Sequence, residues 1–117
     1  MRVRKKEIKF PALGNYRIRI VVTKDVRKYM LTCSEFKDIA MDGEHADTYA
    51  ITLHQVGNNL TYIIFPFGAS VGSIAHECWH AVRKMLLHLN AKLDNEVVAY
   101  HLGYLVNQVY RIVWKNK

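Results

Sequence analysis

The pentad His76-Glu77-Cys78-Trp79-His80 has the pattern H-E-x-x-H, and its sequence context predicts a helix. On an α-helix, residues four apart share one face, roughly 5–6 Å apart between Cβ atoms, so both imidazoles can reach one metal ion. Two imidazoles with one further oxygen or nitrogen ligand suit Zn²⁺, whose fourth position stays open in catalytic sites. Glu77 can then reach a water beside the metal without binding the metal. The pattern therefore predicts a helix that carries a zinc-dependent hydrolytic site.

The length and composition predict a single domain, residues 1–117. A chain of 117 residues has room for one core, and with 50% hydrophobic and 23% charged residues it is unlike a disordered chain. No apolar run approaches the roughly 20 residues that span a bilayer, and the N-terminus lacks a signal-peptide pattern. We therefore expect no membrane partner and a cytoplasmic setting, where Cys33 and Cys78 stay reduced.

Positive charge is concentrated in the first quarter of the chain. Residues 1–28 contain ten Lys and Arg against Glu7 and Asp25, a net charge of +8 within a total of +7. This asymmetry predicts attraction to an acidic partner or to nucleic acid; the alternative is a solubilising surface. Residues 1–9 are expected to form a basic N-terminal segment whose removal leaves the core folded.

Six segments have the apolar spacing of regular secondary structure. In order, they are a strand at 16–23, a helix at 24–36, strands at 48–55 and 60–65, and helices at 70–89 and 95–114. The two middle strands flank a turn rich in Gly and Asn, so they are expected to form a hairpin at the edge of the sheet. The helix after the first strand predicts a crossover to a parallel neighbour, and hence a mixed sheet.

The two C-terminal helices differ in how their apolar residues are arranged. Residues 70–89 have one core stripe, which leaves His76, Glu77 and His80 on another side. Residues 95–114 are apolar around much of the helix, which is typical of burial on more than one side. Because one small domain offers little to bury it, we expect a subunit contact, such as a homodimer.

The pentad, the hairpin before it and the segment Asn95-Glu96-Val97-Val98-Ala99-Tyr100 together resemble a zincin, and among zincins a gluzincin. The resemblance covers roughly residues 46–105 and extends to small zincin-like proteins encoded by phages and prophages. It implies an α+β zincin-like domain in which a strand, a helix, a hairpin and two helices build a short mixed sheet packed on the active-site helix. It also implies that the chain is a zinc metallopeptidase.

The resemblance implies that Glu96 is the third zinc ligand, but the spacing leaves alternatives open. A strictly antiparallel helix pair would bring His101 near His80, and water or Asp94 is a further candidate. Tyr100 shares a helical face with Glu96, so its hydroxyl is a candidate for stabilising an oxyanion, unless it is a core residue. Three further histidines are expected to be strand or surface residues, namely His45, His54 and His88.

The implied mechanism is hydrolysis of a peptide bond by a zinc-activated water that gives its proton to Glu77. The resemblance implies that the substrate is an extended peptide paired with the edge strand at 48–55, where main-chain groups are free to bond. The alternative function is non-catalytic: a zinc-containing protein that binds a partner, or a nucleic-acid-associated regulatory protein of phage origin.

Overall fold

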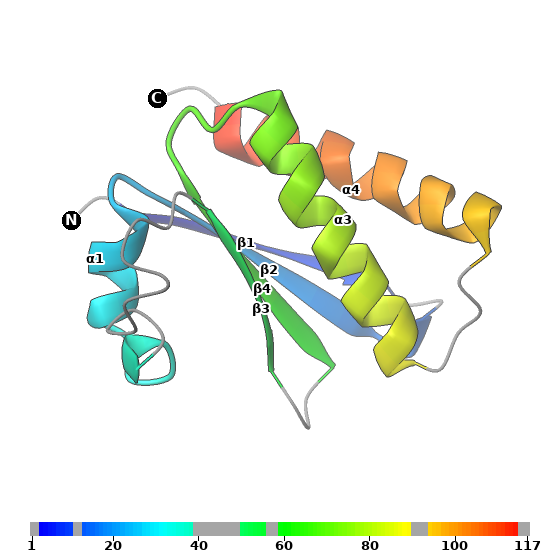
Figure 1. Ribbon diagram of the computed structural model, residues 1–117, viewed down its shortest axis with the longest axis horizontal. Coiled ribbons are helices and arrows are strands. Elements are labelled where there is room, and N and C mark those ends of the chain that lie inside the picture. The colour runs from blue at the N-terminus through cyan, green and yellow to red at the C-terminus, as the bar shows by residue number, and fades with distance from the viewer. Residues whose placement is uncertain (1–2, 11–12, 39–49, 56–58, 90–93, 115–117) are drawn as a thin grey trace.

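The computed structural model describes residues 3–10, 13–38, 50–55, 59–89 and 94–114, apart from the side chains of residues 54 and 55. These segments form a small α+β domain with four strands and three helices, which confirms the α+β part of the predicted fold (Figure 1). The elements are β1 (Val3–Phe10), β2 (Tyr16–Thr23), α1 (Val26–Leu31), β3 (Ile51–Gln55), β4 (Leu60–Pro66), α3 (Val71–His88) and α4 (Asn95–Trp114).

The four strands form one mixed sheet in the order β1-β2-β4-β3. β2 and β4 are parallel, whereas β1–β2 and β3–β4 are antiparallel pairs. The mixed sheet and the hairpin at its edge are therefore confirmed. β3 is the strand at one edge of the sheet, and β1 is the strand at the other. The strand predicted at 48–55 begins at Ile51 in the structure, and residues 48 and 49 lie outside the described residues.

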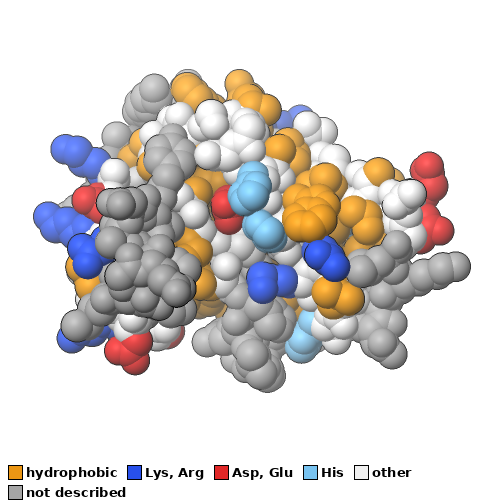
Figure 2. All heavy atoms as spheres, viewed as in Figure 1, with side chains coloured by type: hydrophobic (Ala, Val, Ile, Leu, Met, Phe, Trp, Pro, Cys, Tyr) orange, Lys and Arg blue, Asp and Glu red, His pale blue; other side chains and the backbone are white. Residues whose placement is uncertain are grey.

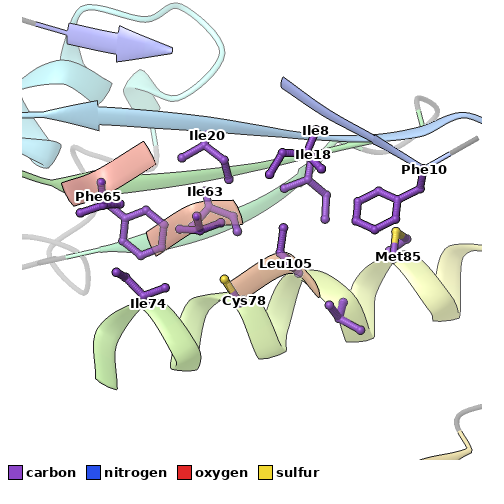
Figure 3. Close-up of a cluster of buried hydrophobic side chains, with 14 of the residues drawn as sticks. Ile8, Phe10, Ile18, Ile20, Ile63, Phe65, Ile74, Cys78, Met85 and Leu105 are labelled. Carbon is purple, nitrogen blue, oxygen red and sulfur yellow. The ribbon is translucent and has the colours of Figure 1, made fainter. Parts of the chain in front are cut away.

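The sheet is covered on both faces, giving three layers (Figure 1). Because side chains alternate along a strand, β2 sends Ile20 and Val22 into a core with α3 and α4, and Val21 into a second core with α1. Figure 3 shows the first core, where Ile74 and Cys78 of α3 point toward the sheet. The first core is apolar and contains the buried residues of α3, so its burial is the main force that holds this helix in place.

Helix α1 is shorter than the helix predicted at 24–36, since it ends at Leu31. Asp25 caps its N-terminus, where its carboxylate accepts a hydrogen bond of 3.0 Å from the Lys28 N–H. Ser70 caps α3 in the same way, accepting a bond of 3.0 Å from the Ser73 N–H. The cap fixes the register at which α3 leaves β4, and that register determines which face carries the pentad.

Most of the basic N-terminal segment predicted at 1–9 belongs to a strand that the sequence patterns did not indicate. Residues 3–10 are the edge strand β1, paired along its whole length with β2. Ile8 and Phe10 are buried in the core formed with α3 and α4. The hairpin turn contains Gly14 and Asn15, with φ of 67° and 59°, in the left-handed region that these two residue types tolerate best.

Helix α4 buries one stripe, formed by Leu105, Val109 and Val113. Several of its large apolar side chains are exposed in the single chain, including Tyr100 and Trp114. The structure therefore leaves the predicted subunit contact untested. None of the helices within the described segments is long and apolar enough to cross a membrane.

Candidate metal site

The pentad lies on α3, as predicted, and the core packing of that helix sets its direction. Cys78, at the centre of the pentad, is fully buried against the sheet. His76 and His80 are two residues to either side of it, and each residue turns an α-helix by about 100°, so both point about 160° away from Cys78. They therefore face outward. Figure 2 shows histidine side chains beside an acidic one in the middle of this face of the molecule.

The two imidazoles face each other. Nε2 of His76 and Nε2 of His80 are 3.2 Å apart, and the ring centroids are 4.7 Å apart. Two nitrogens at about 2.0–2.1 Å from one tetrahedral zinc ion would be ~3.3–3.4 Å apart. The observed separation fits two ligands of one ion, and imidazole nitrogen is a common zinc ligand.

Glu77 lies on the flank of α3 that faces the edge strand β3, and its side chain is only 12% exposed. Oε1 accepts a hydrogen bond of 2.8 Å from the Thr52 hydroxyl of β3, which also lies 3.1 Å from the Glu77 carbonyl oxygen. Oε2 is 3.8 Å from Nε2 of His76. One carboxylate oxygen is thus anchored to the sheet, and the other is directed toward the histidine pair.

Cys78 is not a metal ligand in this arrangement. Burial, and to a lesser extent the neighbouring Glu77 carboxylate, raises the pKa of the Cys78 thiol to about 12. The thiol points into the core, about 160° around α3 from the two histidines, and without a metal beside it the thiol is protonated at neutral pH. Cys78 is instead a small buried residue of the core.

The predicted third ligands lie on α4, away from the pair. Glu96 is an exposed residue in the first turn, and its N–H donates to the Asp94 carboxylate at 2.8 Å. The His101 ring packs edge-on against Phe10 of β1, with centroids 6.1 Å apart. Tyr100 is 74% exposed, and its ring packs edge-on against His101, with ring centroids 5.3 Å apart.

The structure brings His76, Glu77 and His80 together and leaves Glu96 and His101 outside that group. Within the described residues, no three His, Cys, Asp or Glu side chains form a group able to hold a metal ion. The reason is that α4 packs beside α3 on the same face of the sheet (Figure 1), whereas His76 and His80 point away from the buried Cys78. The identity of a third ligand stays a prediction.

The other histidines lie elsewhere. Nε2 of His88, near the end of α3, is 2.8 Å from the Asn59 side-chain oxygen. His54 belongs to β3 through its backbone pairing with Thr61, while its side chain and His45 lie outside the described residues.

Three neighbours of the site were not predicted from the sequence. Thr52 anchors Glu77, as described above. The Trp79 ring packs edge-on against His80, with centroids 5.3 Å apart, and the Arg83 guanidinium lies over Trp79, 5.3 Å from its centroid. Helical spacing could have indicated Arg83, which is three residues after His80 and four after Trp79. Thr52 could not be found that way, because its contact depends on how α3 crosses β3.

Comparisons with protein-family models, with curated proteins and with solved structures gave no match. Functional inference for this chain accordingly rests on the geometry of the pentad and its neighbours.

Proposed function

We propose that this protein is a zinc-dependent peptide hydrolase, with His76 and His80 as metal ligands and Glu77 as the general base. The observation that carries the proposal is the 3.2 Å separation of the two Nε2 atoms next to an anchored carboxylate. A helix with two histidines but no catalytic role has no need to hold a carboxylate against a neighbouring strand, 3.8 Å from one of those imidazoles.

A bound zinc ion would supply a Lewis acid and lower the pKa of a water it holds to about 7. Glu77 takes a proton from the water whose oxygen attacks the peptide carbonyl carbon, and then delivers that proton to the nitrogen as the C–N bond breaks. Thr52 holds Oε1, so Oε2 is the oxygen that carries the proton. The anchor keeps the carboxylate in one orientation, which limits the reorganisation needed during the reaction.

We propose that the substrate is an extended peptide paired with β3. This strand is at an edge of the sheet, and Thr52 in it contacts Glu77, so a peptide bound along β3 passes close to the general base. The proposal does not depend on Tyr100, whose catalytic role would require its hydroxyl to approach from α4.

The metal site is tested by the zinc content and zinc affinity of purified protein. We expect about one zinc ion per chain, and a sharp loss of affinity in His76→Ala and His80→Ala, because each removes a ligand. His88→Ala removes an imidazole from the same helix outside the site and should bind zinc like the wild type. Parallel titrations of Glu96→Ala and His101→Ala identify the third ligand: the gluzincin resemblance predicts a severe loss only for Glu96→Ala. Equal zinc affinity in His80→Ala and wild type would exclude the site.

The catalytic role is tested by comparing wild type with Glu77→Gln on a broad peptide library. The amide cannot accept a proton, so cleavage should be abolished while zinc content and the thermal unfolding midpoint are unchanged. If the zinc-loaded wild type cleaves nothing, or Glu77→Gln cleaves equally well, the protein is a metal-containing binding module.

A further inference from the structure

A groove of about 640 Å³ runs between β1 and α4, on the side of the molecule away from β3. One wall consists of six consecutive strand residues, Arg4 to Lys9. The other is one face of α4, with Tyr104, Gln108, Arg111 and Ile112. The two walls are tied together at one end, where the Arg4 guanidinium donates to the Ile112 carbonyl at 2.6 Å.

The groove follows the outer edge of the β1 backbone. Side chains of consecutive strand residues point to opposite faces, so six in a row can line one groove only along the strand edge. Within the described segments, β1 pairs with β2 alone. Its other edge therefore presents main-chain N–H and C=O groups to the groove, with no strand beside them among the described residues.

The groove is strongly basic. Lys6 and Arg111 are exposed on its two walls, and Lys5 and Lys9 are exposed on the opposite face of β1. The acidic lining residue is Glu7, and its carboxylate is already engaged by Arg19 at 3.0 Å and by Arg17 at 3.7 Å. An acidic segment bound in the groove would therefore lie near Lys and Arg side chains on both faces of β1. The Glu7 carboxylate would repel it little, because that carboxylate is already paired with two arginines.

We propose that this groove binds an extended acidic segment of another protein, which adds to β1 as a fifth strand. Acidic side chains that alternate with neutral ones share one face of the added strand, and on that face they lie against Lys6 and Arg111. Six residues of strand span about 20 Å, so the groove accommodates a segment of roughly that length. A groove between an edge strand and a helix is a recurrent geometry for peptide binding by strand addition.

The strand edge favours a peptide over nucleic acid. An edge strand offers hydrogen-bond donors and acceptors in alternation, and a peptide backbone matches both. A phosphate backbone has only hydrogen-bond acceptors. It could accept bonds from the N–H groups of β1, but it would leave the carbonyl oxygens of β1 without a donor. The groove is also separate from the histidine pair on α3, so this inference does not rest on the proposed hydrolase activity.

Fluorescence anisotropy with a labelled decapeptide of alternating Glu and Thr tests the proposal. We expect binding that weakens as NaCl rises from 50 to 500 mM, and that persists in EDTA and in His76→Ala. The double variant Lys6→Glu/Arg111→Glu should lose affinity at least about tenfold, because attraction becomes repulsion on both walls of the groove, at Lys6 of β1 and at Arg111 of α4. The matched control Lys24→Glu/Lys28→Glu makes the same charge change at exposed residues near α1 and should lose much less. Both variants should keep the wild-type circular dichroism spectrum, since all four side chains are exposed.

Backbone pairing is tested with two further decapeptides, N-methylated at every Thr or at every Glu. Each keeps the charge and blocks the amide donors along one edge of the peptide. We expect at least one of them to bind about tenfold more weakly, and the unmethylated peptide to slow amide hydrogen exchange in β1. Equal binding of all three peptides would overturn strand addition. Tighter binding of the single-stranded oligonucleotide dT10, with displacement of the peptide, would show instead that the groove is a nucleic-acid site.

Discussion

Replacing Phe10 by alanine should destabilise the whole domain, although half of the residues in the strand that contains Phe10 are basic. Its side chain is 6% exposed, and its ring packs edge-on against Tyr104 and His101 of α4, with centroids 5.8 and 6.1 Å away. Removing a buried phenyl group costs about 3–5 kcal/mol, and that figure includes the cavity left behind. Because domains of this size are stable by about 5–15 kcal/mol, Phe10→Ala should lose a large part of the total.

Urea denaturation followed by circular dichroism measures this loss as a fall in the unfolding midpoint at constant slope. The matched control is Lys9→Ala, one residue earlier in the strand and exposed, which should change the free energy of unfolding by less than about 0.5 kcal/mol. If Phe10→Ala were as stable as Lys9→Ala, the Phe10 ring would not contribute to the core, and this reasoning would be refuted.

Two further predictions concern α3. Thr52→Val removes the 2.8 Å hydrogen bond to Glu77, and a hydrogen bond to a carboxylate is worth about 1.5–3 kcal/mol. The variant should therefore hydrolyse peptides about tenfold more slowly, or slower still, with its zinc content unchanged. Thr52→Ser keeps the hydroxyl and should restore activity. The pKa of Cys78 is about 12 in the folded protein and near 8.5 in an unfolded chain, so its contribution to stability is complete below pH ~8.5 and is lost as pH rises toward 12. Wild type should therefore lose up to about 1.4 kcal/mol per pH unit more than Cys78→Ala above pH ~9 in urea titrations, and identical slopes would refute the assignment.

The arrangement around α3 was predictable because it depends on local spacing. The interval of four between His76 and His80, and the apolar stripe through Ile74 and Cys78, fix the helix and the side on which the histidines lie. The hairpin was predictable for a similar reason, since its turn residues lie next to each other in the sequence. In each case the residues that determine the structure are close together in the chain.

Strand β1 could not be predicted because charge obscured its alternation. Only Ile8 and Phe10 are buried on its core face, while Arg4 and Lys6, which share that face, reach α4 and solvent. Edge strands carry such charges to discourage pairing with other chains, so a basic composition is compatible with a strand. The position of Glu96 was unpredictable for another reason: the angle between two packed helices depends on side chains throughout the core, which loop symmetry does not reflect.

The contact between β1 and α4 has a consequence for the order of folding. Arg4 and Ile112 are 108 positions apart in the chain and are joined by a hydrogen bond of 2.6 Å. During synthesis at about 5–20 residues per second, β1 and β2 emerge several seconds before the helix that covers them. Until α4 is made, the Phe10 ring lacks the helix that covers it, and the nascent chain exposes an apolar surface that is prone to aggregation. Folding of the domain is thus tied to completion of its last helix, and a chain that ends before residue 95 lacks one wall of the core.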